Sequence, residues 1–530
     1  MMEGIVTELG ERLIHRQSRP PQIRPLGVKK HYTFTPMTPI NEMNYPDFMI
    51  SVDDILNHIG FGRYQMISIL VIGLMLINDG TEIIVLSFLV SVLKNDWNLD
   101  ISTVSLFSSA VFGGVFIGSA LSEKLADRYG RLRMLAGVEL LIYLTGIASA
   151  NAKDIVLLTL IRGIYGFLLG LRFPTCFQYI NEVTPLQVRL KTVLLAGGFI
   201  TLGKIFAAVV ADLTLVDMES GDWQKMLFWL VQPSIVALTL LAIFLKESPY
   251  YHIIVKKDLD EGLYLLKSMW RFNHANATAP QDYSNLFSAK NKIGLQNWAD
   301  STYAKKNVEK ITNIANYIKE QFKTLHLSIW VTWFMLPAIN YGILFTLPTV
   351  LTNFNHIHVE HELLKVIVVV LAEVPSVLVA NYLIDKRMVG AKQMTVFGMV
   401  GTTLSFIAML LFVEELIIFG LASARFFLNI CFQAALSHNS QLYSLSTGGP
   451  STKLLFGWKR LAIVLVPWIT KFLLASSVGT LFAGYLILSI IVLISALCMP
   501  QTLRAQELEY TEMKVMKSVP DLDMLDSEDI

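Results

Sequence analysis

Long apolar runs recur along most of this chain and are separated by short polar turns. About 20 apolar residues are enough for a helix to cross the hydrocarbon core of a bilayer. The pattern therefore predicts an all-α membrane protein with two groups of six membrane-spanning helices, one on each side of a long polar segment. We place the twelve spans near 65–92, 103–122, 133–150, 155–181, 192–211, 225–245, 327–351, 363–384, 393–413, 416–438, 455–476 and 480–499.

The composition agrees with a multi-pass membrane protein. Of the 530 residues, 53% are hydrophobic and 16% are charged, whereas a soluble domain has about 25% charged residues. Cys176, Cys431 and Cys498 all fall inside apolar runs, so no disulfide framework or metal-binding spacing is present. We find no nucleotide-binding loop and no nucleophile motif in a soluble segment. The sequence therefore predicts no enzyme, no cofactor, no metal and no nucleic-acid partner.

Lys and Arg residues divide the loops into two classes. The loops after the second, fourth, sixth and eighth spans carry basic clusters, whereas the opposite loops carry at most one basic residue each. An excess of Lys and Arg marks the cytoplasmic side of a membrane. We therefore expect both termini on the cytoplasmic side, or on its equivalent in an organelle. The sequence does not distinguish between the plasma membrane, a vesicle membrane and an organelle inner membrane as the location of the protein.

The polar segments complete a division of the chain into five parts. The long segment between the sixth and seventh spans contains EGLYLLKSMW and VEKITNIANYIKEQF, which are amphipathic and predict short interfacial helices. The chain ends in the acidic sequence SVPDLDMLDSEDI, which is typical of a disordered tail. The parts are a cytoplasmic N-terminal tail (1–64), a six-helix bundle (65–246), a cytoplasmic linker with short amphipathic helices (247–325), a second six-helix bundle (326–500) and an acidic cytoplasmic tail (501–530).

Ionisable residues inside the predicted spans are the first candidates for a functional site. Each costs about 2.5–3.5 kcal/mol to insert at mid-bilayer on insertion scales, so it needs a reason to be there. Asp79 and Glu82 lie three residues apart on one face of the first span. Arg425, Asn429 and Gln433 repeat every four residues and form a polar stripe along the tenth span. The other deep charges are Arg162, Arg172, Lys204, Glu373 and Lys471.

Motifs at the predicted turns resemble those of the major facilitator superfamily of secondary transporters. LADRYGR (125–131), in the turn after the second span, is similar to the L-A-D-R-x-G-R signature of that family, and YLIDKRMVGAKQ (382–393) repeats it in weaker form. The start of the first span, DDILNHIGFGRYQ, is similar to the branch of synaptic vesicle glycoproteins and of organic-ion and sugar transporters. Three further stretches resemble motifs of the family and follow in the order that the family has: RGIYGFLLG (162–170), EVTPLQVR (182–189) and ESPYY (247–251).

The resemblance covers residues 52–510 and implies the major facilitator fold, with twelve transmembrane helices in two six-helix bundles. It implies a secondary transporter that moves a small organic solute, charged or neutral, by alternating access. The resemblance allows transport with or without proton coupling. If transport is coupled, the carboxylate of Asp79 or Glu82 is the expected proton carrier. The resemblance places most of the deep charges at a central cavity. The expected solute-binding residues are Asp79, Glu82, Lys204, Tyr341, Glu373, Arg425, Asn429 and Gln433.

The signature turn is a gate in that family, which implies a gate here. The resemblance implies that Asp127 faces the positive helix end of the eleventh span, while Arg131 pairs with acids near the fourth span. The expected gating residues are Asp127, Arg128, Arg131, Arg162, Glu182 and Arg189.

Three deep charges have further interpretations. Arg162 is alternatively a brace between the first and fourth spans, with Asp79 or Glu82 as its partner. Arg172 lies nearer the basic loops and is a candidate member of the gate. Glu139, on the third span, is expected to reach the aqueous boundary with its carboxylate.

Departures from the family pattern keep a second function open. Glu123 replaces the first glycine of the signature, and Ala391 replaces the arginine of its repeat. Gln441, Ser444 and Gly448 stand where the family has Glu, Pro and Arg. The alternative to a transporter is therefore a non-transporting scaffold with this fold, or a subunit of a larger membrane complex. In both cases the lipid bilayer is an expected partner. A transporter would also bind a small organic solute and, if it is proton-coupled, protons, whereas a scaffold would bind other membrane subunits.

Overall fold

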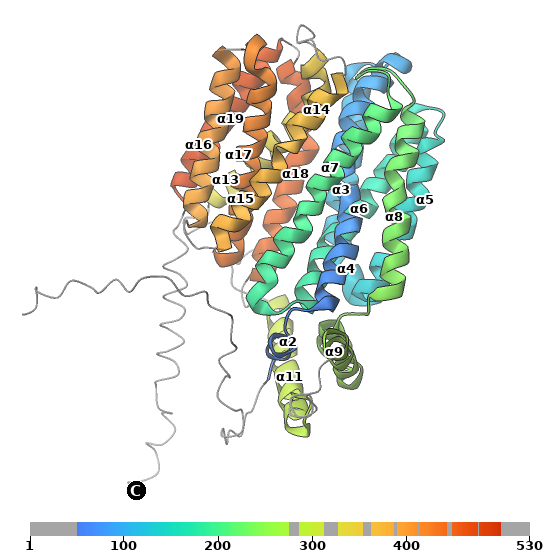
Figure 1. The fold of residues 1–530 in the computed structure, drawn as a ribbon, viewed down its shortest axis with the longest axis vertical. Coiled ribbons are helices and arrows are strands. Elements are labelled where there is room, and N and C mark those ends of the chain that lie inside the picture. The colour runs from blue at the N-terminus through green and yellow to red at the C-terminus, as the bar shows by residue number, and fades with distance from the viewer. Residues whose placement is uncertain are drawn as a thin grey trace, which may run out of the picture. The chain divides into compact units, whose positions relative to one another are not determined.

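The computed structural model describes residues 50–274, 286–311, 327–352, 362–385, 390–411, 413–442, 448–474 and 476–499. In these ranges the chain is helical apart from short turns and one isolated bridge between Leu215 and Gly221. The first bundle (Figure 1) consists of α3 (Arg63–Asp96), α4 (Ile101–Tyr129), α5 (Arg131–Ala150), α6 (Ile155–Val183), α7 (Arg189–Thr214) and α8 (Trp223–Phe244). The second consists of α13 (Leu327–Thr352), α14 (Glu362–Leu371), α15 (Glu373–Asp385), α16 (Ala391–Leu411), α17 (Val413–Leu442), α18 (Gly448–Leu474) and α19 (Val478–Leu497).

These helices confirm the predicted all-α membrane fold. Within the described residues, 11 helical segments are long and apolar enough to cross a membrane. The eighth predicted span is formed by α14 and α15 together. The eleventh predicted span is α18, a 27-residue helix. The part of α18 whose side chains are described, residues 457–474, carries three basic residues, Lys459, Arg460 and Lys471.

The two ends of the first bundle differ in the chemistry of their turns. We call the end with the turns at 129–131, 183–189 and 245–250 the basic end, and the end with the turns at 97–100, 151–154 and 215–222 the far end. At the far end, α4, α6 and α8 begin behind Asp100, Asp154 and Asp222, and each carboxylate accepts a backbone N–H of the first turn. Such N-caps satisfy donors that have no partner within the helix. The Lys/Arg distribution predicts that the basic end faces the cytoplasm.

Glycines allow α4 and α6 to pack with their backbones in contact. A Cβ atom added at Gly118 of α4 would lie 2.1 Å from the carbonyl oxygen of Phe167. A Cβ atom added at Gly166 of α6 would lie 2.2 Å from the carbonyl oxygen of Val111. Small residues drive close helix association in membranes, where lipid removes the hydrophobic driving force. In the RGIYGFLLG motif, Gly166 therefore has a packing role, as does Gly170, whose added Cβ atom would lie 2.3 Å from the carbonyl oxygen of Val115.

Gly166→Ala is expected to destabilise the protein by about 1–3 kcal/mol, because the new methyl group forces two backbones apart. Gly163→Ala on the same helix is the matched control, since its Cβ would lie 3.8 Å from the nearest atom, a carbonyl oxygen. Alanine is also favoured over glycine in a helix interior by roughly 1 kcal/mol. Thermal unfolding in detergent should show a loss for the first variant only. Equal behaviour of the two would contradict the close packing.

Helices at the basic end attach to the first bundle. Asp53 of α2 (Val52–Ile59) forms an ion pair of 2.6 Å with Arg189 at the start of α7. Asn273 of α9 (Leu259–Asn273) accepts a hydrogen bond of 2.9 Å from the backbone N–H of Tyr64 in α3. The backbone N–H of Ile50 binds the carbonyl of Gly294 in α11 (Ala289–Ile311) at 3.2 Å.

The predicted interfacial stretch EGLYLLKSMW lies within α9. Its partner VEKITNIANYIKEQF begins at the end of α11 and continues outside the described residues, as do most of the N-terminal tail and the acidic C-terminal tail. The division into five parts stays a prediction. Within the part predicted as the N-terminal tail, the structure adds the helix α2.

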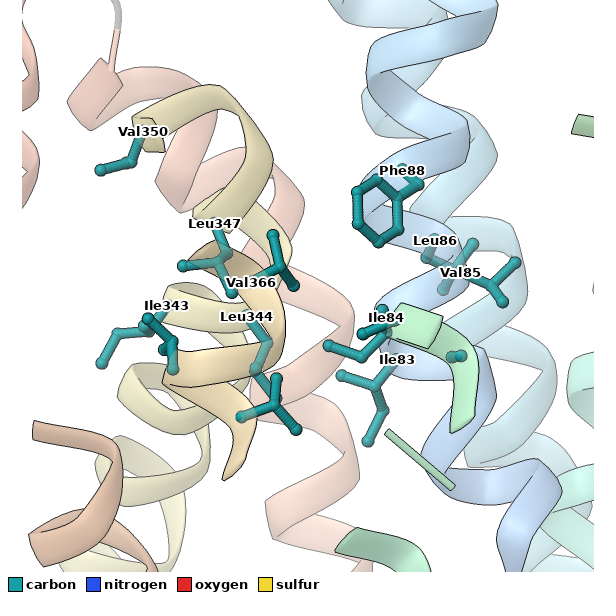
Figure 2. Packing of buried hydrophobic residues seen from close by; sticks show 14 of the residues in the cluster. Ile83, Ile84, Val85, Leu86, Phe88, Ile343, Leu344, Leu347, Val350 and Val366 are labelled. Carbon is teal, nitrogen blue, oxygen red and sulfur yellow. The ribbon is translucent and has the colours of Figure 1, made fainter. Parts of the chain in front are cut away.

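An apolar core joins the two bundles in their far halves. Ile83, Ile84 and Phe88 of α3 belong to the same buried cluster as Leu347 of α13 and Val366 of α14. Figure 2 shows these side chains between the facing helices. All five are at most 9% exposed. The contact therefore excludes water between the bundles at this level.

Candidate solute-binding site and gate

Glu373 lies at a break in the middle of the eighth span. The helix stops at Leu371 and restarts at Glu373. Pro375 has no backbone N–H, so the helical hydrogen bond to the carbonyl of Leu371 is missing. The break places Glu373 in the first turn of α15, where the positive end of the helix dipole favours a carboxylate. Its side chain is fully buried.

Two cations from different bundles bind this one carboxylate. The Nζ atom of Lys204, on α7 of the first bundle, lies 2.6 Å from Oε2 of Glu373. The Nε atom of Arg425, on α17 of the second bundle, donates to Oε1 of Glu373 at 3.0 Å, and its Nη2 atom bonds the same oxygen. Lys204 is 6% exposed and Arg425 is 0% exposed. We call these three residues the interbundle triad.

Polar side chains of the second bundle extend the triad. Arg425 also donates through Nη1 to the carbonyl oxygen of Asn340 on α13 at 2.8 Å. One turn along α17, Asn429 donates to the hydroxyl of Ser376 at 2.7 Å. Gln433 is buried one turn further. Arg425 and Asn429 of the stripe expected along the tenth span therefore face the helix break at Glu373.

Tyr341 marks the interface between the bundles beside the triad. Its ring meets the ring of Phe112 on α4 edge to face, with centroids 6.2 Å apart. Because α13 and α4 belong to different bundles, this aromatic contact crosses the interface.

A second group of charges lies entirely within the first bundle. Arg172 of α6 donates to Asp79 of α3 at 2.7 Å and to Glu139 of α5 at 2.8 Å. Arg172 and Glu139 are both 0% exposed. We call these three residues the arginine cluster. The expectation that Glu139 reaches the aqueous boundary is therefore wrong, because α6 covers it and supplies a guanidinium partner. Arg172 pairs with this cluster, away from the residues of the predicted gate.

Arg162 of α6 forms an ion pair with Glu82 of α3. Their Nη1 and Oε2 atoms lie 2.9 Å apart, and the guanidinium stacks over the ring of Tyr165 at 5.0 Å. Of the two interpretations of Arg162, this geometry is that of a brace between the first and fourth spans. Asp79 and Glu82 thus both bind arginines of α6.

The signature turn at the basic end brings together three of the motifs. Gly130 joins α4 to α5 with a φ of +102°, a conformation that side chains disfavour. Glu247, from the ESPYY motif, accepts the backbone N–H groups of Arg131 and Leu132 at 3.0 and 3.1 Å. It therefore caps the start of α5. The sequence identifies the ESPYY motif but does not predict this capping role of Glu247.

Arg131 is the centre of the predicted gate. Its guanidinium lies 3.0 Å from both Asp127 and Glu182 and 4.9 Å from the ring centroid of Tyr251. Burial raises the pKa of the Tyr251 hydroxyl, so the ring stays neutral. We call Asp127, Arg131 and Glu182 the gate cluster.

The other predicted gating residues lie around this cluster. Arg189 pairs with Asp53 of α2, and Arg128 is exposed over the ring of Tyr129. The predicted contact of Asp127 with the eleventh span involves residues 443–456, whose side chains lie outside the described part of the chain.

Two cations of α18 do not appear among the residues predicted for the site. Lys459 of α18 is 4% exposed, and its Nζ lies 4.2 Å from the ring centroid of Phe432. Arg460 lies 4.8 Å from the ring centroid of Phe173 on α6, in the other bundle. The signal was available, since both basic residues fall inside a predicted apolar span.

Residues 76–513 match the family model described as "Sugar (and other) transporter". The chain belongs to this family. It is 26% identical over 467 residues to the synaptic vesicle 2-related protein of Bos taurus, which covers 83% of this chain and 79% of that protein. It is 22% identical over 482 residues to organic cation/carnitine transporter 7 of Arabidopsis thaliana, covering 84% and 93%.

The fold is similar to that of the proton:xylose symporter XylE of E. coli, a member of the major facilitator superfamily. The TM-score is 0.63 at 18% identity, covering 83% of this chain and 96% of the symporter. Together with the family match, this confirms a major facilitator protein of the predicted branch. The chain is a multi-pass membrane protein of the secondary transporter type and is not an enzyme.

Proposed function

We propose that this protein moves a small organic anion across the membrane by alternating access, with the interbundle triad at its solute site. The observation that carries the proposal is the one carboxylate of Glu373 between the cations of Lys204 and Arg425. The triad carries one positive charge in excess. A buried charge without compensation is costly, so the carboxylate of a solute would be attracted to this point.

The same geometry links binding to movement. Lys204 is bound to Glu373 across the interface, so this ion pair holds the two bundles together at mid-membrane. A solute carboxylate that forms an ion pair with Lys204 in place of Glu373 would break this contact between the bundles. The far-half apolar contact crosses between the bundles and is formed in this structure, so it would have to open in the other state, as bistable contacts do in switching proteins. The gate cluster lies within the first bundle, where it would rearrange as the basic end opens and closes.

We place proton coupling at the arginine cluster. Asp79 and Glu139 share the single guanidinium of Arg172, so these three residues by themselves have one negative charge in excess when both carboxylates are ionised. Arg460 of α18 also attracts Asp79 from the second bundle, so the charge of the site depends on how the bundles meet. Two carboxylates that share a site favour holding one proton. The pair of Glu82 and Arg162 is already balanced, which makes Glu82 the weaker candidate.

The alternative is a non-transporting scaffold or a subunit of a membrane complex. Its supporting observation is that the charges of the triad already bind one another, and mutually bound charges need no solute.

We also infer from the Lys/Arg distribution that the basic end faces the cytoplasm.

Uptake into proteoliposomes tests the proposal. We expect the full-length protein to transport monocarboxylates in preference to organic cations and neutral sugars. Lys204→Gln should raise the KM for the carboxylate by about tenfold or more, since a charge-assisted hydrogen bond contributes about 1.5–3 kcal/mol. Lys471→Gln is the control, because this lysine contacts Ser102 at 2.8 Å in an exposed position.

Transport of cations in preference to anions would overturn the solute class. A folded wild-type protein that moves no member of the panel would favour the scaffold.

A further inference from the structure

A cavity of about 410 Å³ opens at the basic end of the first bundle, between α4, α5 and the short helix η3 (Tyr251–Lys256). Its volume is in the range of small-molecule sites, which are roughly 300–1,000 Å³. All the residues that line it belong to the first bundle and the segment that follows it. It is therefore separate from the interbundle triad.

The mouth of the cavity is strongly basic. Arg128, Arg133 and Lys256 line it, and all three side chains are exposed. None of the described residues that line the cavity is acidic. Three positive charges around one opening attract an anionic group.

The interior of the cavity is apolar and extends along α5. Met134, Val138 and Leu141 lie on successive turns of one helix face. Gly137 leaves space between them, because a Cβ atom added there would meet no atom within 4 Å. Leu141 is 47% exposed, so the groove is open on the side of the hydrocarbon. The cavity thus combines a basic rim at the membrane boundary with an apolar channel that runs along about two turns of α5, roughly 10 Å.

We propose that this cavity binds an anionic phospholipid, with its phosphate group on Arg128, Arg133 and Lys256 and an acyl chain along α5. Basic pockets between transmembrane helices are suited to anionic head groups. A soluble phosphate would use the rim and leave the apolar channel empty, so a lipid is the occupant that matches both parts.

The site is joined to the gate cluster through Tyr251. Its ring lines the cavity and lies 4.9 Å from the guanidinium of Arg131. A bound lipid would hold Tyr251 against Arg131. Occupancy therefore favours the state in which the gate cluster is formed.

Native mass spectrometry of the full-length protein tests the proposal. The protein is released from phosphatidylcholine vesicles made with and without phosphatidylserine. We expect the wild type to retain phosphatidylserine in preference to phosphatidylcholine. Replacing Arg128, Arg133 and Lys256 by Gln should lower this preference by about fivefold for each residue. Replacing Lys124, Lys191 and Lys290 by Gln removes the same charge outside the cavity and should leave it unchanged.

A second variant tests the apolar channel separately. Gly137→Leu fills the channel and keeps all three cations, so it should also reduce lipid retention. Gly197→Leu on α7 is its control, since a Cβ atom there likewise meets nothing within 4 Å. Retention unchanged in both the triple variant and Gly137→Leu would overturn the proposal. Displacement of the lipid by millimolar inorganic phosphate, with Gly137→Leu unaffected, would show a phosphate site and overturn it too.

Discussion

Glu373→Gln is expected to destabilise the protein by about 3–5 kcal/mol and to abolish transport. The substitution leaves the charges of Lys204 and Arg425 buried beside each other without a counterion. Removing one partner of a buried ion pair has a cost of this order, because the remaining charge stays desolvated. Thermal unfolding of the purified protein in detergent, together with uptake into proteoliposomes, measures both effects.

Lys204→Met is the matched comparison for Glu373→Gln. It leaves Glu373 bound to Arg425 as a neutral pair, so it should lower stability much less. The double variant Lys204→Met with Glu373→Gln should recover part of the loss, since only Arg425 then lacks a counterion. If Glu373→Gln is no less stable than Lys204→Met, the triad does not depend on charge balance and the proposed solute site loses its basis.

Asp79→Asn is expected to remove the dependence of solute accumulation on a pH gradient. In the wild type, a solute anion that enters with one proton should accumulate up to about tenfold for each unit by which the donor side is more acidic. Asp79→Asn leaves Glu139 and Arg172 as a balanced pair, so no proton is needed at the cluster. The variant should then equilibrate solute without accumulating it.

Glu82→Gln separates this effect from a general loss of function. It removes the partner of Arg162 and should lower stability and rate. The accumulation ratio should still follow the pH gradient, because the arginine cluster is intact. A pH response that survives in Asp79→Asn and is lost in Glu82→Gln would move the proton site to the pair of Glu82 and Arg162.

The fold could be predicted because its signals are local. Apolar length defines the spans, and the motifs lie at the turns between them. Glu373, Lys204 and Arg425 could be named as candidates for a similar reason, since a charge inside an apolar run is visible in the sequence.

Pairing could not be predicted, because it depends on which helix faces meet. The sequence makes Arg172 one candidate for the gate because it lies toward the basic end, but its side chain is on the face of α6 that meets α3 and α5. Glu139 was expected at an aqueous boundary from its depth alone, whereas α6 covers it. The capping role of Glu247 arises from a contact across more than a hundred residues of chain.

The attachment of α2 and α9 to the first bundle has a practical consequence for measuring motion. Asp53 binds Arg189, and Asn273 binds Tyr64, so both helices are fastened to the ends of α7 and α3. A spectroscopic reporter on the exposed face of α9 would therefore follow rigid rotation of the whole first bundle. Its distance to a second reporter on α16 would record the transport cycle without any label inside the membrane.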